Sequence, residues 1–150
     1  MQGRSFLSTA QFLREHGDCE ADWRTVVSRA YYACYLELRA VALANCDPAV
    51  VRTRLGTRPE KELGHEKFHG WLMGQWVSDE VREIGELLKD LYGQRLDADY
   101  NMNVPMTDAN AERVCGDASY VLEQLDCVTG RDFGQAIETP LRAQGSEGRR

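Results

Sequence analysis

The sequence lacks the features of a secreted or membrane-spanning protein. Its five cysteines are odd in number and form no Cys-x-x-Cys pair, so neither a disulfide framework nor a cysteine-rich zinc site is expected. The N-terminus "MQGRSFLSTAQFL" has no apolar run of signal-peptide length, and no segment approaches the roughly 20 apolar residues that span a bilayer. We therefore expect a cytoplasmic protein with no membrane partner.

Positive charge is also scarce. The 18 lysines and arginines are outnumbered by 24 aspartates and glutamates, which gives a net charge of −6. A general attraction to nucleic-acid phosphates or anionic membranes is not expected at this charge, so any RNA contact must be local. The 150 residues, 43% of them hydrophobic, suit one compact domain with a real core.

Alternating strand patterns are absent, and apolar residues recur at helical spacing instead. The clearest helix spans 22–45, which contains no glycine or proline. A helix over 5–16 is expected to begin at Ser5 as N-cap and to end at Gly17. Further helices are predicted around "HEKFHGWLMGQW", after Ser78 and after Thr107. The pattern predicts an all-α, up-and-down bundle of four to five helices.

We expect this bundle to occupy residues 1–127 and to be followed by a flexible tail over 128–150, where periodicity is lost. Residues 46–64 form a connection in which a solvated loop is one interpretation and a basic, phosphate-facing patch is another. The basic residues of that connection are Arg52, Arg54, Arg58 and Lys61.

An arginine interrupts the apolar seam of the late helix. Positions 81, 84, 88, 91, 95 and 98 follow a three–four spacing, and Arg95 stands where the earlier turns carry Val, Ile and Leu. Such an arginine must be paired or must face a wet cleft, because an unpaired buried charge costs several kcal/mol. Asp99 is placed for an i,i+4 pair. A buried scaffold pair and a phosphate-binding cleft both stay open; we favour the cleft because the helix ends there.

Three segments together resemble the HEPN family of small helical domains: "SRAYYACYLELRAVAL", "LKDLYGQRLDADYNM" and "VPMTDANAERVCGDASYVLEQL". The closest branch has a late helix that ends in an Arg-x-x-x-Asp-Tyr pattern, and the resemblance runs from about Leu7 to Cys127. It implies an HEPN-like up-and-down bundle that dimerises with the late helix near a shared cleft. Leu87, an apolar residue off the seam, independently favours a homodimer.

The resemblance also implies a function. Many relatives are ribonucleases or toxins of toxin–antitoxin pairs, often encoded beside a nucleotidyltransferase-like partner. Their catalytic pattern is an arginine followed after four to six residues by a histidine, whereas Tyr100, Asn101 and Met102 stand here. Metal-independent RNA cleavage needs a proton carrier that works near neutrality. We expect a dimeric, RNA-associated binding or regulatory protein that needs no cofactor and whose ribonuclease activity is lost or weak.

The candidate site residues follow from the same resemblance. If the chain is a metal-independent endoribonuclease, Arg95 would steady the scissile phosphate and Asp99 would orient the arginine. Tyr100, or a histidine of "HEKFH", would move protons. The residues expected to bind RNA or a partner are Arg29, Tyr32 and Asn101. Ordinary core packing is the alternative for the tyrosines of the second helix.

The stretch "HEKFH" at 65–69 also matches His-Glu-x-x-His, in which two histidines bind zinc and the glutamate acts as general base. Lys67 stands where zinc proteases of that class prefer an uncharged residue, and the extension that supplies a third histidine in one large subgroup is absent. The alternative function is a zinc-dependent hydrolase that uses His65, Glu66 and His69. A purely structural adaptor is a third possibility.

Overall fold

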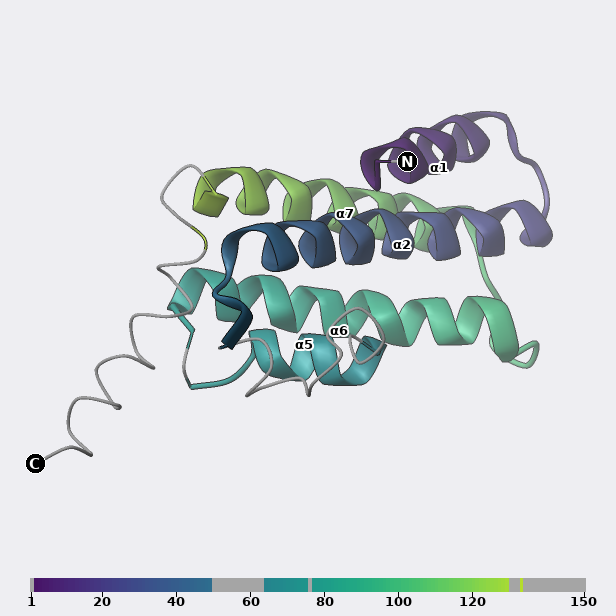
Figure 1. The fold of residues 1–150 in the computed structure, drawn as a ribbon. Helices are drawn as coiled ribbons and strands as arrows, with labels where there is room; N and C mark the ends of the chain where they lie inside the picture. The colour runs from purple at the N-terminus through teal and green to yellow at the C-terminus, as the bar shows by residue number, and fades with distance from the viewer. Residues whose placement is uncertain (1, 50–63, 76, 130–132, 134–150) are drawn as a thin grey trace, which may run out of the picture. The chain divides into compact units, whose positions relative to one another are not determined.

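A computed structural model describes residues 2–49, 64–75, 77–129 and 133. Within these ranges the regular structure is entirely helical, which confirms the predicted all-α bundle (Figure 1). The helices are α1 (Arg4–His16), α2 (Glu20–Asn45), α5 (His65–Leu72), α6 (Asp79–Tyr100) and α7 (Asp108–Thr129). None of these helices is both long and apolar enough to cross a bilayer. The basic residues of the 46–64 connection lie outside the described residues.

Two helices begin at the capping residues that the sequence predicts. The Ser78 hydroxyl accepts a hydrogen bond from the Val81 N–H at 3.3 Å, at the start of α6. The Thr107 hydroxyl accepts one from the Asn110 N–H at 3.2 Å, at the start of α7. Each bond satisfies a backbone donor that has no partner within the helix.

The predicted cap of α1 is wrong. Gly3 already has helical angles, φ −55° and ψ −36°, so the helix begins before Ser5, whose hydroxyl donates to the Gln2 carbonyl at 2.6 Å. A Cβ on Gly3 would lie 2.8 Å from the Ala33 carbonyl oxygen. Glycine thus lets the start of α1 approach the backbone of α2. The predicted end at Gly17 is confirmed, because its ψ of 149° takes the chain out of the helix.

Contacts group the chain into two compact units, whereas one domain over 1–127 was expected. The first unit consists of Met1–Glu37 and Leu87–Glu123. It holds α1, most of α7, the first part of α2 and the last part of α6. Helical spacing predicts much of its core, including the fully or almost fully buried Val27, Tyr31, Cys34, Leu88, Leu91, Ala111, Val114, Ala118 and Val121.

The core of the first unit contains polar groups that are held in their neutral forms. Burial raises the pKa of the Cys34 thiol to about 12, and this thiol donates to the Ala118 carbonyl at 3.4 Å. Burial also raises the pKa of Tyr31, and the neighbouring Tyr35 and Tyr92 raise it further. The ring centroids of Tyr31 and Tyr92 are 5.7 Å apart, which packs α2 against α6.

The second unit consists of Leu38–Glu86 and Gln124–Arg150. Its buried side chains include Leu38, Phe68, Trp71, Leu72, Ile84 and Leu125. A Cβ added to Gly85 would lie 2.8 Å from the Leu72 Cβ and 2.9 Å from its carbonyl carbon. Real Cβ atoms do not approach other atoms so closely. The two helices α5 and α6 can therefore pack against each other here only because residue 85 is a glycine.

The last helix extends slightly beyond its expected end. α7 continues to Thr129, where the tail was expected to begin at residue 128. Val128 and Phe133 are 7% and 1% exposed, so apolar burial carries the ordered chain past the predicted boundary. The rest of the predicted tail lies outside the described residues.

Candidate functional site

Arg95 lies at the centre of a polar cluster within the first unit. Its Nη2 donates to the Tyr32 hydroxyl at 2.8 Å and to the Tyr100 hydroxyl at 3.4 Å. Its guanidinium carbon also lies 5.1 and 5.3 Å from the centroids of these two rings, which is within cation–π range. One tyrosine from α2 and one from the end of α6 therefore fix the orientation of the guanidinium.

Asp99 supplies the counter-charge. Its Oδ2 lies 2.8 Å from the Arg95 Nε, the i,i+4 pair that the spacing predicts. The Nε makes no well-aligned hydrogen bond, so the contact is an ion pair at short range. The Ser28 hydroxyl donates to the same Oδ2 at 3.2 Å. Asp99 thus connects the arginine to α2 as well as balancing its charge.

The guanidinium is more enclosed than expected. Arg95 is 8% exposed, whereas the adjoining Tyr100 is 70% exposed. Tyr32, 63 residues earlier in the chain, contacts the guanidinium through both its hydroxyl and its ring, a contact that spacing within one helix does not predict. Nη1 donates to no described residue and is not among the fully buried polar atoms without a partner, so the guanidinium is open to solvent at Nη1.

Arg95 keeps its positive charge in the folded protein. Burial alone would lower the pKa of its guanidinium, but Tyr32, Asp99 and Tyr100 together outweigh this effect and the pKa is raised. An arginine is cationic throughout the pH range in which proteins fold, and this environment strengthens that state. The cluster therefore presents a permanent, oriented positive charge beside an exposed aromatic ring.

Two predicted site residues do not join this cluster. The exposed Arg29 lies over the ring of Phe6 in α1, 5.3 Å from its centroid. Asn101 follows α6, and its side-chain oxygen accepts a hydrogen bond from the Asn103 N–H at 3.3 Å. Among the described residues, no hydrogen bond or ion pair connects either residue to Arg95. Tyr32, Asp99 and Tyr100 are the predicted residues that the fold brings to Arg95.

Sequence reasoning missed Arg24, which is 9% exposed. Its guanidinium donates to four backbone carbonyls at the end of α6 and just beyond it, those of Asp97, Ala98, Asn101 and Val104. Its Nη2 also pairs with a Glu20 carboxylate oxygen at 2.7 Å. Carbonyls in the last turn of a helix have no partner within it. Arg24 therefore holds the segment that carries Asp99 and Tyr100.

The sequence indicates only one of the contacts that Arg24 makes. Glu20 and Arg24 stand at i,i+4, which predicts an ordinary surface ion pair on a helix. Nothing in that spacing indicates that the same guanidinium reaches a segment more than 70 residues later. Long-range contacts of this kind depend on how α2 and α6 pack.

The two histidines of "HEKFH" lie on α5. His65 is half-buried and His69 is 8% exposed. In the described part of the chain, they belong to no group of three side chains that could hold a metal ion. A rigid zinc site needs at least three supported ligands. The geometry therefore gives the zinc-hydrolase alternative no support.

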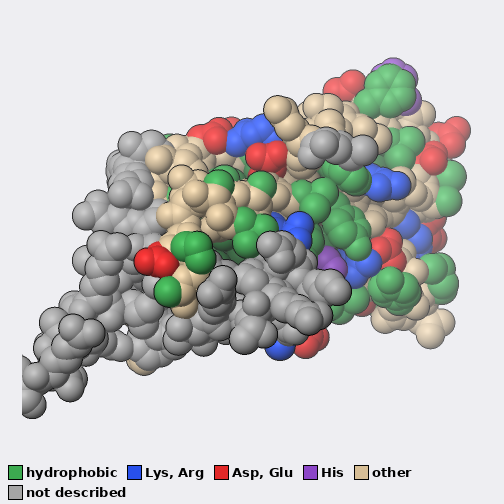
Figure 2. Space-filling model, viewed as in Figure 1, with side chains coloured by type: hydrophobic (Ala, Val, Ile, Leu, Met, Phe, Trp, Pro, Cys, Tyr) green, Lys and Arg blue, Asp and Glu red, His purple; other side chains and the backbone are tan. Residues whose placement is uncertain are grey.

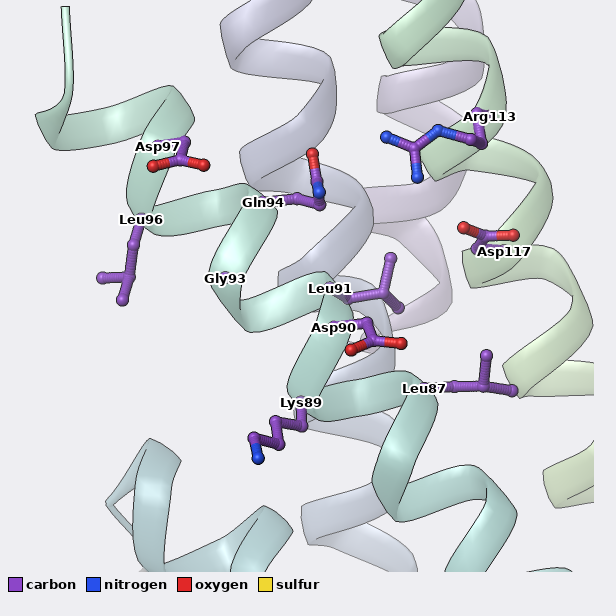
Figure 3. A pocket seen from close by; sticks show the side chains of 10 residues that line it. All are labelled: Leu87, Lys89, Asp90, Leu91, Gly93, Gln94, Leu96, Asp97, Arg113 and Asp117. Carbon is purple, nitrogen blue, oxygen red and sulfur yellow. The ribbon is translucent and has the colours of Figure 1, made fainter. Parts of the chain in front are cut away.

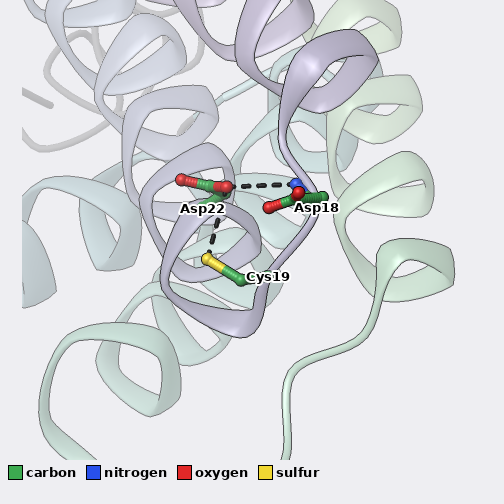
Figure 4. A group of neighbouring side chains, drawn as sticks. All are labelled: Asp18, Cys19 and Asp22. Atoms are coloured by element: carbon green, nitrogen blue, oxygen red, sulfur yellow. Dashed lines mark hydrogen bonds between the residues drawn. The ribbon is translucent and has the colours of Figure 1, made fainter.

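Among the residues that the structure describes, one group of potential metal ligands does occur, at the start of α2. It consists of Asp18, Cys19 and Asp22 (Figure 4). The Asp22 Oδ2 accepts hydrogen bonds from the Asp18 N–H at 3.1 Å and from the Cys19 thiol at 3.3 Å. The first of these bonds is the main reason that the pKa of Asp22 is lowered. The carboxylate caps the helix N-terminus, which accounts for the group without a metal.

Comparison of the chain with protein-family models, with curated proteins and with solved structures gives no match. The fold class thus comes from the structure itself, and the HEPN resemblance depends on the three segments that carry it. The Arg95 cluster is the part of the described chain whose chemistry indicates a function.

Proposed function

We propose that this chain is an HEPN-like, RNA-associated module of a toxin–antitoxin or defence system, and that it binds or regulates rather than cleaves. The supporting observation is the Arg95 guanidinium, oriented by two tyrosine hydroxyls beside the 70% exposed Tyr100. A guanidinium suits phosphate oxygens because its N–H groups form a planar fork. An exposed aromatic ring suits an unpaired base. Single-stranded RNA offers both groups together.

The chemistry of the cluster favours binding over catalysis. Cleavage needs a group that takes a proton from the RNA 2′-hydroxyl and returns one to the leaving oxygen. The polar contacts of Arg95 in the described chain are with Tyr32, Asp99 and Tyr100, none of them a histidine. Tyrosine ordinarily has a pKa of about 10, far from neutrality. Ribonuclease activity is accordingly lost or weak, and a nucleotidyltransferase-like protein is the expected protein partner.

Replacing Tyr100 with alanine should weaken RNA binding without unfolding the chain. We expect a loss of about tenfold or more in affinity, since stacking on one base contributes about 1–3 kcal/mol. The measurement is the fluorescence anisotropy of a labelled single-stranded RNA oligonucleotide titrated with protein at low salt. Tyr120→Ala is the matched control, because Tyr120 is also exposed (41%) but lies on α7; its affinity should equal that of the wild type.

Two results would contradict the proposal. One is an absence of RNA binding by the wild-type chain at low salt. The other is an equal affinity of Tyr100→Ala and Tyr120→Ala. A duplex of the same length should bind more weakly than the single strand, because its bases are already stacked on one another.

The proposed module is a homodimer, and the outer face of α6 supplies a surface for it. A groove of about 620 Å³ lies between α6 and α7 (Figure 3). Its charged lining residues are Lys89, Asp90, Asp97, Arg113 and Asp117. Both signs are present, so the groove can pair with a second copy of itself about a two-fold axis. The half-buried Leu87 and Leu96 add apolar surface to the same groove.

Gly93 offers a direct test of this interface. It is exposed within the groove, and a Cβ there would meet nothing within 4 Å in the chain itself. Gly93→Lys should thus fold normally but prevent a second copy from approaching. Light scattering should give about twice 17.0 kDa for the wild type and about 17.0 kDa for the variant. Gly116→Lys, equally unobstructed on α7, should remain dimeric. A dimeric Gly93→Lys, or a monomeric wild type, would contradict the proposed interface.

A further inference from the structure

Arg29 is an exposed cation on the surface of the first unit. It forms no ion pair and no hydrogen bond with the described residues, and its contact is with the ring of Phe6. Stacking on an aromatic face holds a guanidinium in place while its N–H edges stay free for other partners. The guanidinium borders a small cavity of about 310 Å³, which Ser5 and Thr9 also line.

The hydroxyls beside Arg29 cannot replace it as donors. The Ser5 hydroxyl donates to the Gln2 carbonyl at 2.6 Å, and the Thr9 hydroxyl donates to the Ser5 carbonyl at 3.0 Å. Each hydroxyl has a single hydrogen, so both donors are occupied. An anion that enters this cavity would depend on Arg29 for its hydrogen bonds.

Arg29 is a neighbour of the Arg95 cluster across one turn of α2. Arg29 and Tyr32 stand at i,i+3, a spacing that brings Cβ atoms to about 5–6 Å on a helix surface. The Tyr32 hydroxyl in turn lies 2.8 Å from the Arg95 Nη2. Arg29 faces α1, through Phe6, and Arg95 comes from α6. Arg29 and the Arg95 cluster therefore belong to the same turn of α2, Arg29 by its own position and Arg95 through its contact with Tyr32.

We propose that Arg29 binds a second phosphate of the same RNA strand, so that the strand crosses α2 with one phosphate at Arg95 and a neighbouring phosphate at Arg29. This inference rests on the proposed function. Each guanidinium is held by an aromatic ring, and each keeps an N–H edge that no described residue uses. This arrangement selects a ligand with at least two phosphodiester groups and disfavours a mononucleotide.

The number of phosphates that the chain neutralises can be measured, and the charge of the chain indicates that this number is small. The net charge is −6, and on the face drawn in Figure 2 basic and acidic side chains are interspersed. Few phosphates are therefore neutralised on binding. For single strands, the logarithm of the affinity falls with the logarithm of salt concentration by about 0.7 per neutralised phosphate, so two phosphates give a slope of about −1.4.

The test is the salt dependence of anisotropy-measured affinity for a single-stranded RNA oligonucleotide. We expect a slope of about −1.4 for the wild type and about −0.7 for Arg29→Gln, since one phosphate contact is lost. Arg29→Lys retains the charge and should retain the wild-type slope. Arg82→Gln removes the same charge from a surface pair with Asp79, and its slope should also equal that of the wild type. Circular dichroism checks that each variant is folded.

The outcomes separate this inference from the proposed function. If the wild type binds RNA and Arg29→Gln has the wild-type slope, the second phosphate position is wrong while the proposed function stands. A slope that falls equally in Arg29→Gln and Arg82→Gln would also overturn it, because the effect would then be one of net charge. If the wild type binds no RNA, the proposed function and the second position both fail.

Discussion

Replacing Arg24 with methionine should lower the free energy of unfolding by about 2–4 kcal/mol, since a buried carbonyl that loses its donor costs about 1–3 kcal/mol. Methionine keeps most of the apolar stem but removes a donor from four backbone carbonyls. Those of Asp97 and Asn101 still accept from the Asn101 and Val104 N–H groups, so the main loss is at Ala98 and Val104. Arg24→Lys should recover little of this loss, because one ammonium cannot reach the carbonyls that a planar fork spans. Urea denaturation followed by circular dichroism gives the difference.

The matched control is Arg14→Met. Arg14 pairs with Glu112 at 3.0 Å, and the glutamate side chain is 66% exposed. A solvent-exposed pair of this kind contributes about 1 kcal/mol or less. If Arg24→Met were no more destabilised than Arg14→Met, water would be satisfying the carbonyls and Arg24 would not be holding the end of α6.

The contribution of Arg24 should also depend on pH through Glu20. The pKa of Glu20 is lowered from its ordinary value of 4.5, first by the hydrogen bond from Arg24 and then by the Met106 N–H. A carboxyl group with a lowered pKa in the folded state stabilises the fold above its unfolded pKa. That stabilisation is lost as the pH falls through the folded value. The difference between wild type and Arg24→Met should therefore shrink below pH 4.5.

The second large effect is expected at Arg95 and Asp99. Asp99→Ala should cost about 3 kcal/mol, the low end of the range for breaking a buried pair, because it leaves Arg95 enclosed without its carboxylate. The low end applies because the Asp99 side chain is 26% exposed. The double variant Arg95→Met/Asp99→Ala should recover part of this loss, which gives a coupling energy of about 1–3 kcal/mol.

Two measurements should be made on the four proteins of this double-mutant cycle, which are the wild type, the two single variants and the double variant. Denaturant melts give the coupling in stability, and RNA anisotropy gives the coupling in binding. The proposed function requires that both variants lacking Arg95 bind RNA more weakly. A large coupling in stability with unchanged RNA affinity would show that the pair is scaffold and that Arg95 does not bind the phosphate.

Helical spacing was sufficient for the parts of the fold that depend on local sequence. The α6 seam through Val81, Ile84, Leu88 and Leu91 is buried as predicted, because a period of 3.6 residues fixes which side chains share a face. The same rule placed Asp99 within reach of Arg95. The start of α1 does not follow from the same rule, because Gly3 already has helical backbone angles two residues before the predicted N-cap at Ser5.

The rest of the candidate site depends on how the helices pack. The enclosure of Arg95 follows from Tyr32, and the support of Asp99 follows from Ser28 and Arg24, all three on α2. Sequence spacing describes one helix at a time, so it cannot show which residues of two helices meet. Arg29 lies only one residue from Ser28, yet the turn of the helix directs it towards Phe6 and α1.

The buried cysteines allow the local opening of each unit to be measured separately, through the rate at which a reagent labels their thiols. Cys34 and Cys115 are buried in the first unit, and Cys46 is buried in the second. A thiol reagent reaches such a sulfur only when the surrounding structure opens, so its labelling rate reports the free energy of that local opening. Equal opening energies at Cys34 and Cys46 would mean that the two units unfold as one cooperative body. Unequal energies would identify the unit that opens first.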